Sequence, residues 1–223
     1  SYADQGFKDF VLCLGYKGDF IKRYFLHQAA MTNDFTIDLS RPGHVEFHNK
    51  VQKDWRITCV DTGLDTLTGG RLKRVERYLE GEHFLLTYGD GLSDVDVNES
   101  YEFHKKHGKA VTVTGVRPQS RFGELVVDGD QVSRFSEKPD VQHGYINGGF
   151  FVMSKKALSY VSDDVNCTLE REPLEEAAAA NDLMVYKHHG YWQCMDTYRD
   201  LMLLESEWKT GQAPWSKWSK ESS

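Results

Sequence analysis

Short apolar runs alternate along the chain with stretches of helical periodicity. Residues 10–14 form an apolar run, and after a glycine turn Phe20, Tyr24 and Phe25 recur at helical spacing. A strand, a turn and a helix in this order make half of a βαβ unit. The alternation continues through the chain, which predicts an α/β fold with a mixed, mostly parallel sheet flanked by helices.

Residues 84–91 carry the first chemical signal, a short apolar run that ends in Gly89-Asp90-Gly91. An apolar run bounded by turn residues predicts a buried strand of a parallel sheet, and ligands bind at the carboxyl edge of such sheets. The two glycines leave little side-chain bulk around the Asp90 carboxylate. This arrangement suits a hard divalent cation that carries a phosphate, although an Asp-Gly step is also common in ordinary turns.

Residues 61–71 are rich in hydroxyl groups and glycine and precede a helical pattern at 72–79. Gly69 and Gly70, at the entry of that helix, would let a ligand approach bare backbone amides, which bind anions or the edge of a nucleobase. A helix N-terminus with ordinary loop glycines is the competing interpretation.

Other aspartates allow two interpretations. Asp94 and Asp96 form an Asp-x-Asp pair, which is typical of the metal sites of some glycosyltransferases. The pair also precedes a helical stretch that would stop at Gly108, and capping of that helix is the prediction we prefer. Asp196 precedes the last helical pattern, so from its position alone it is better explained as an N-cap than as a metal ligand.

Residues 31–60 depart from the α/β alternation. Their short alternating pieces, joined through Pro42-Gly43, predict a protruding loop or a small antiparallel excursion inside a single domain that covers residues 1–223. Further along, residues 124–135 predict a hairpin that turns at Asp128-Gly129.

Composition narrows the classes of partner. The chain has 27 Lys and Arg against 34 Asp and Glu, a net charge of -7 and no long basic stripe, so we expect no nucleic-acid partner. No apolar run approaches the roughly 20 residues that cross a bilayer, so we expect no membrane partner. Four widely spaced cysteines without metal-ligand spacing predict reduced, buried thiols in a cytoplasmic protein. They are Cys13, Cys59, Cys167 and Cys194.

Taken together, the motifs resemble those of the sugar-nucleotide nucleotidyltransferases, and of their cytidylyl branch in particular. They are Gly15-Tyr16-Lys17-Gly18, Thr68-Gly69-Gly70-Arg71-Leu72-Lys73-Arg74, Thr87-Tyr88-Gly89-Asp90-Gly91, Arg121-Phe122-Gly123, Glu137-Lys138-Pro139, Ile146-Asn147-Gly148-Gly149-Phe150-Phe151, Trp192-Gln193 with Met195-Asp196-Thr197, and residues 211–215. Each motif is weak alone, but their order and spacing are specific and cover essentially the whole chain.

The resemblance implies a Rossmann-like fold and a reaction between CTP and glucose 1-phosphate. In such enzymes a sugar phosphate oxygen attacks the α-phosphorus in line, and pyrophosphate leaves. The resemblance implies that Asp90 and Asp196 hold Mg²⁺, or Mn²⁺ in its place, and that Lys138 holds the sugar phosphate. It also implies a nucleotide site lined by Thr66, Gly69, Gly70, Arg71 and Gly89. Finally, it implies glucose contacts at Gly123, Glu137, Asn147 and Gly148.

The chain departs from the family pattern at its beginning. That pattern opens with a strand and a glycine-rich loop, Gly-Gly-x-Gly-Thr-Arg-Leu in outline, which wraps the triphosphate. None of it is among the 223 residues, and Ser1 falls where the helix after the loop would be ending. We therefore expect a chain that is truncated, or a longer protein of which this is a part.

Two other functions compete with nucleotidyl transfer. One is a metal-dependent glycosyltransferase that uses the Asp-x-Asp pair, and the other is a non-catalytic subunit that binds a nucleotide or a sugar phosphate. For the nucleotidyltransferase we also expect a homo-oligomer, with residues 31–60 as the candidate for subunit contacts.

Overall fold

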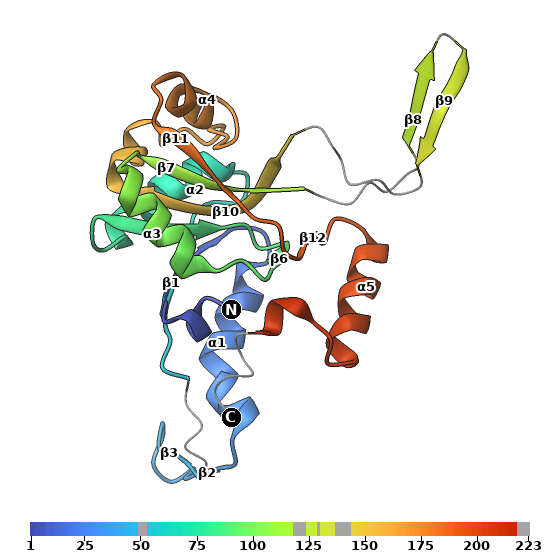
Figure 1. Cartoon of the computed structure of the whole chain (residues 1–223). Helices are drawn as coiled ribbons and strands as arrows, with labels where there is room; N and C mark the ends of the chain where they lie inside the picture. Colours follow the sequence, from blue (N-terminus) through green and yellow to red (C-terminus); the bar gives the residue numbers. More distant parts are fainter. Residues whose placement is uncertain (49–52, 118–123, 129, 137–143, 218–223) are drawn as a thin grey trace. The chain divides into compact units, whose positions relative to one another are not determined.

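The structure, a computed structural model, describes residues 1–48, 53–117, 124–128, 130–136 and 144–217 (Figure 1). Contacts between Cα atoms divide the chain into two compact units. The first unit consists of Ser1–Gln5, Gly81–Ala157 and Glu175–Ser223, and the second of Gly6–Glu80 and Leu158–Leu174. The expectation of a single domain over residues 1–223 stays a prediction.

The first unit is built on a four-stranded sheet in the order β11-β7-β10-β5. Its strands are β5 (His83–Thr87), β7 (Val111–Val116), β10 (Ile146–Ser154) and β11 (Leu183–Lys187). β11 runs parallel to β7, whereas β10 runs antiparallel to both β7 and β5. The mixed α/β class is confirmed, although fewer ladders are parallel than we expected. The ladder of β5, which we expected to be parallel, is antiparallel where it meets β10.

The core of this unit lies along β10, where Phe151, Val152 and Met153 are buried. Helix α3 (Val97–His107) contacts β7 and β10. It begins at Asp96, whose side chain accepts a hydrogen bond from the Glu99 amide at 2.9 Å, and it stops at a left-handed Gly108. The predicted capping role of Asp96 and the predicted stop are both confirmed.

A short antiparallel ladder in the same unit joins β6 (Gly91–Ser93) to β12 (Trp192–Cys194). Helix α5 (Tyr198–Lys209) follows β12 and begins with a capping box between Thr197 and Asp200. Thr197 is therefore the N-cap, and the interpretation of Asp196 as the cap is wrong. The hydroxyl one residue later satisfies the first turn and leaves the Asp196 carboxylate out of the helix terminus.

The second unit contains a parallel pair, β1 (Asp9–Leu14) and β4 (Arg56–Asp61). Helix α1 (Gly18–Thr32) contacts β4, and helix α2 (Thr68–Val75) contacts β1. The predicted excursion contains an antiparallel pair, β2 (Phe35–Ile37) with β3 (Val45–Phe47). Its last piece differs from the expectation, because β4 extends the β1 sheet in parallel.

The remaining elements are short. They are η1 (Ala3–Gln5), η2 (Glu76–Tyr78), η3 (Lys155–Ser159), α4 (Glu172–Ala179) and the antiparallel pair β8 (Glu124–Asp128) and β9 (Gln131–Ser136). The pair confirms the predicted antiparallel strands, while Gly129 of the predicted turn lies outside the described residues. Within the described ranges, no helix combines the length and the apolarity that a bilayer crossing requires. The four cysteines are free, as expected, but Cys13 is exposed and the others are half-buried, so the prediction of buried thiols is wrong.

Candidate active site

Three side chains of types that can ligate a metal ion meet beside the β6–β12 ladder. Asp90 directly precedes β6, Cys194 ends β12, and Asp196 follows two residues later. The Met195 amide donates to the Asp90 carbonyl oxygen at 2.9 Å, which ties the two segments together. One donor atom from each of the three side chains lies within 4.8 Å of the others. A search of the described residues for three Asp, Glu, His or Cys side chains close enough to share one ion finds this group.

The electrostatics of this group favour a cation. Asp90 and Asp196 are exposed, and Cys194 is half-buried. The Cys194 thiol donates to Asp196 Oδ1 at 3.2 Å. Burial, followed by this hydrogen bond and the charges of the two carboxylates, raises the pKa of the Cys194 thiol to about 11. The thiol is therefore protonated at neutral pH, and the two carboxylates are the charged donors that a divalent ion would meet.

The stretch from Asn147 to Gly149 in β10 lies beside the strand that leads to Asp90. The Tyr88 amide donates to the Gly149 carbonyl oxygen at 3.0 Å, and Asn147 Nδ2 lies 3.4 Å from the Tyr88 hydroxyl. Asn147 and Gly89 are exposed, whereas Gly148 is buried and a Cβ there would lie 2.8 Å from Val116 Cγ1. The structure thus brings Gly89, Asp90 and Asn147 onto neighbouring stretches, with Gly148 behind them.

The predicted nucleotide residues of the second unit are bonded within that unit. The Gly69 and Gly70 amides both donate to the Cys167 carbonyl oxygen, at 2.9 and 3.1 Å. A Cβ at position 70 would lie 2.5 Å from the Asp164 carbonyl oxygen. Both glycines therefore allow close packing of the 164–167 loop on the start of α2. Their amides are occupied, which differs from the expectation that they meet a ligand directly.

Thr66 and Arg71 brace the loop that precedes α2. Arg71 donates to Thr62 Oγ1 at 2.7 Å and to the Leu64 carbonyl oxygen at 3.1 Å. Thr66 is buried, and its hydroxyl accepts a hydrogen bond from Arg74 at 2.7 Å. These bonds fix the shape of residues 62–66, and the role of Thr66 and Arg71 in nucleotide binding stays a prediction. Gly123, Glu137 and Lys138, the other predicted contacts, lie outside the described residues.

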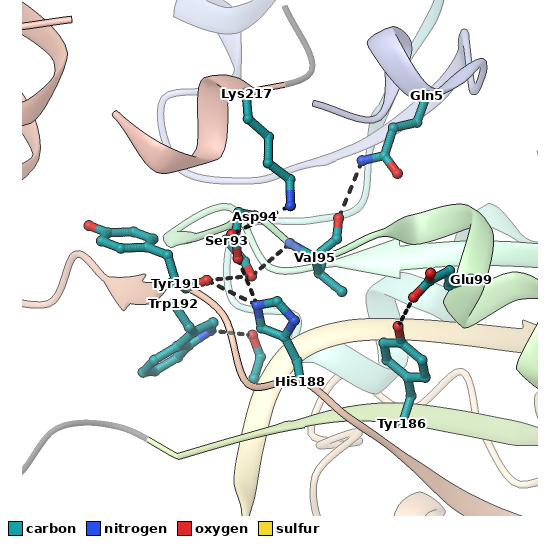
Figure 2. Close-up of polar contacts among 11 residues, drawn as sticks. Gln5, Ser93, Asp94, Val95, Glu99, Tyr186, His188, Tyr191, Trp192 and Lys217 are labelled. Carbon is teal, nitrogen blue, oxygen red and sulfur yellow. Dashed lines mark hydrogen bonds and ion pairs between the residues drawn. The ribbon is translucent and has the colours of Figure 1, made fainter. Parts of the chain in front are cut away.

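The Asp-x-Asp pair has other partners. Asp96 caps α3, and the Asp94 carboxylate lies 2.9 Å from His188 Nε2 and 3.4 Å from Lys217 Nζ (Figure 2). The two side chains are thus engaged separately, which removes the structural support for a shared metal site at Asp94 and Asp96.

Comparison with known proteins identifies the family. A family model described as "Nucleotidyl transferase" matches residues 30–210. The chain is a member of the nucleotidyl transferase family. The resemblance found in the sequence motifs is thereby confirmed.

Relatives of this nucleotidyl transferase share most of its length. Glucose-1-phosphate cytidylyltransferase of Salmonella typhi is 44% identical over 218 residues, which are 97% of this chain and 84% of that protein. A probable glucose-1-phosphate cytidylyltransferase of Bacillus subtilis is 42% identical over 217 residues, again 97% of this chain and 84% of that protein. The crystal structure of HddC from Yersinia pseudotuberculosis has a TM-score of 0.64 at 20% identity, covers 92% of this chain and 81% of that one, and shows a common fold.

The sequence of this nucleotidyl transferase also contains a signal for Cys194. We treated the four cysteines as isolated thiols, because they are far apart from one another. The relevant neighbour was Asp196, two positions away, since alternate residues of an extended segment project to the same side. The spacing of Cys194 to an acidic residue, rather than to another cysteine, is therefore the feature that indicates its place in this group.

Proposed function

We propose that the chain transfers the cytidylyl group of CTP to α-D-glucose 1-phosphate and releases CDP-glucose and pyrophosphate. The observation that carries this proposal is the 44% identity, over 97% of the chain, with the Salmonella typhi glucose-1-phosphate cytidylyltransferase. The Bacillus subtilis relative, at 42% identity, bears the same substrate in its name. The proposal applies that substrate class to this chain.

The reaction brings two polyanions together, so positioning and charge neutralisation provide most of the catalysis. A bound divalent cation supplies charge neutralisation at the phosphoryl oxygens. In this proposal Asp90 and Asp196 hold Mg²⁺, or Mn²⁺ in its place, since a hard cation is retained by one or two carboxylates and water. The protonated Cys194 thiol, which donates to Asp196 at 3.2 Å, orients that carboxylate.

Substrate contacts are assigned from the family resemblance. Lys138 holds the sugar phosphate, while Gly123, Glu137, Asn147 and Gly148 face the glucose hydroxyls. The exposure of Asn147 supports its part in this set. The carbonyl oxygen of Gly148 already accepts a hydrogen bond from Trp192 Nε1 at 2.7 Å, and a Cβ at this position would meet Val116 Cγ1 at 2.8 Å, so Gly148 would act by close packing that supports the exposed Asn147.

The nucleotide contacts are also assigned from the family resemblance, and each unit is considered by itself. Gly89 is exposed, with open space where a Cβ would stand. Thr66 and Arg71 act by holding residues 62–66 in shape, since their polar groups are engaged there. Gly69 and Gly70 act through the close packing of α2, which sets the position of the same loop.

The proposal includes a homo-oligomer in the cytoplasm. In the second unit, large apolar side chains of α1 and the β2–β3 region are exposed, with Leu26 at 79%, Met31 at 82% and Leu39 at 85%. Clustered exposed apolar side chains are typical of protein interfaces. Four free cysteines support a reducing compartment.

A pyrophosphate-release assay tests the proposal. The protein is incubated with glucose 1-phosphate and each of CTP, UTP, GTP and ATP in the presence of Mg²⁺. We expect pyrophosphate and CDP-glucose with CTP and much less product with the purine nucleotides. Release of a nucleoside diphosphate from CDP-glucose would instead indicate a glycosyltransferase, and CTP binding without turnover would indicate a non-catalytic subunit.

A further inference from the structure

A cluster of hydrogen bonds joins the end of β11 to the β6–β12 ladder, and the chemistry proposed above does not use it (Figure 2). His188, directly after β11, places Nε2 at 2.9 Å from Asp94 Oδ1 and at 3.2 Å from the Tyr191 carbonyl oxygen. Both of these oxygens are acceptors, so Nε2 carries the proton and donates to them. We call this pair of side chains the Asp94–His188 clasp.

The clasp is enclosed rather than solvent-exposed. The His188 side chain is 11% exposed and the Asp94 side chain 20%. A Cβ at position 190 would lie 2.7 Å from His188 Cε1, so a glycine at this position lets the chain pass close to the ring. Hydrogen bonds shielded from water in this way are stronger than those on the surface.

Hydrogen bonds to the Tyr191 carbonyl oxygen connect the clasp to β6 and β12. The Asp94 amide donates to the Tyr191 carbonyl oxygen at 3.2 Å, and the Ser93 hydroxyl donates to the same oxygen at 2.8 Å (Figure 2). Asp94 directly follows β6, and Tyr191 directly precedes β12. The clasp therefore fastens one end of the ladder.

The ladder itself is short. It consists of three residue pairs, Gly91 with Cys194, Leu92 with Gln193, and Ser93 with Trp192. A pair of strands this short is weakly stable alone, and a slip by one residue would turn its side chains to the opposite face. Asp90 and Asp196 lie beyond the other end of the ladder, about 10 Å along a strand of this length. Whether the two carboxylates face one point depends on the register.

We propose that Asp94 and His188 are positioning residues: by holding β6 in register against β12, they keep Asp90 and Asp196 directed at one divalent cation. This inference rests on the metal role in the proposed function. It assigns the Asp94–His188 pair a part in metal affinity without direct contact with the ion.

Mn²⁺ titration of the full chain, followed by the electron paramagnetic resonance signal of free Mn²⁺, tests the proposal without any turnover. His188→Ala should raise the Mn²⁺ dissociation constant about tenfold, since loss of one shielded hydrogen bond to a charged group changes an equilibrium on this scale. His188→Gln should recover most of the affinity, because the Gln amide can donate from near the position of Nε2. Asp90→Asn removes one of the two proposed metal carboxylates, so the Mn²⁺ binding that is lost in this variant is the binding at this site.

Tyr186→Phe is the matched control. Tyr186 lies in β11, two residues before His188, and donates to Glu99 Oε2 at 2.9 Å (Figure 2). Its loss removes a comparable hydrogen bond that fastens α3 rather than β12. We expect unchanged Mn²⁺ affinity in this variant, with melting temperatures recorded for all proteins.

The outcomes separate the clasp from the metal site. If the wild type binds Mn²⁺ and folded His188→Ala has the same dissociation constant, the positioning role of the clasp is refuted and the metal site stands. The same conclusion follows if Tyr186→Phe weakens Mn²⁺ binding as much as His188→Ala does. Absence of Mn²⁺ binding that depends on Asp90 would overturn the metal role and the clasp together. If His188→Ala does not fold, Asp94→Asn decides in its place: a weaker, neutral hydrogen bond should still raise the dissociation constant about threefold, and no change would contradict the proposal.

Discussion

His104 in α3 should make the stability of the protein sensitive to acid. Its side chain is fully buried, and its pKa is lowered from 6.5 to about 4, first by burial and then by the neighbouring His107 and His83. His104 Nδ1 lies 2.8 Å from Thr112 Oγ1, and His107 Nε2 lies 2.7 Å from the same oxygen.

The hydrogen bonds determine where the protons lie. The Lys109 amide donates to His107 Nδ1 at 2.9 Å, so neutral His107 carries its proton on Nε2 and donates to the Thr112 hydroxyl. The hydroxyl can then donate to His104 Nδ1. Protonation of Nδ1 would give the ring its second proton and would break this hydrogen bond.

The direction of the effect follows from the two pKa values. Below pH 6.5 the unfolded chain binds a proton at His104, whereas the folded chain binds it only near pH 4. The free energy of unfolding therefore falls as the pH drops through this window, and above pH 6.5 the site has little influence. For these two values, the loss between pH 7 and pH 5 is about 2 kcal/mol.

Urea denaturation of wild type and His104→Gln at pH 7 and at pH 5 measures this loss. Glutamine does not titrate, and its amide can still bond to the Thr112 hydroxyl. We expect the free energy of unfolding of the wild type to fall by about 2 kcal/mol more than that of the variant. The same pH dependence in both proteins would refute the argument, because it would show that His104 binds its proton equally in the two states.

Other predictions address the site and its support. Asp196→Asn should abolish turnover and leave the melting temperature unchanged, because Thr197 caps α5; a less stable but active variant would contradict the metal role. Lys138→Ala should raise the KM for glucose 1-phosphate tenfold or more, since a hydrogen bond to an ionised group contributes about 1.5–3 kcal/mol; unchanged steady-state kinetics would exclude the phosphate contact. Gly70→Ala should destabilise the protein by about 1–3 kcal/mol in urea denaturation, since its Cβ would meet the Asp164 carbonyl oxygen at 2.5 Å, and stability equal to wild type would count against this packing.

The amino-acid sequence was sufficient to predict the family and much of the local structure. Motif order and spacing identified the family, because weak motifs become specific when many of them occur in one order along the chain. The cap at Asp96 and the stop at Gly108 were predictable, since caps depend on residues within one helical turn. Asp90 was likewise placed at the end of a strand by its immediate neighbours.

Contacts between distant segments depend on the whole fold. Capping of α5 by Thr197 rather than Asp196 depended on the exact start of the helix, which the pattern defines only within one or two residues. The antiparallel direction of β10, the Cys167 carbonyl oxygen that occupies the Gly69 and Gly70 amides, and the approach of Cys194 to Asp90 depend on pairings between segments far apart in the chain. Local periodicity specifies which side of a strand is apolar but not which strand lies beside it, so only the folded chain shows these contacts.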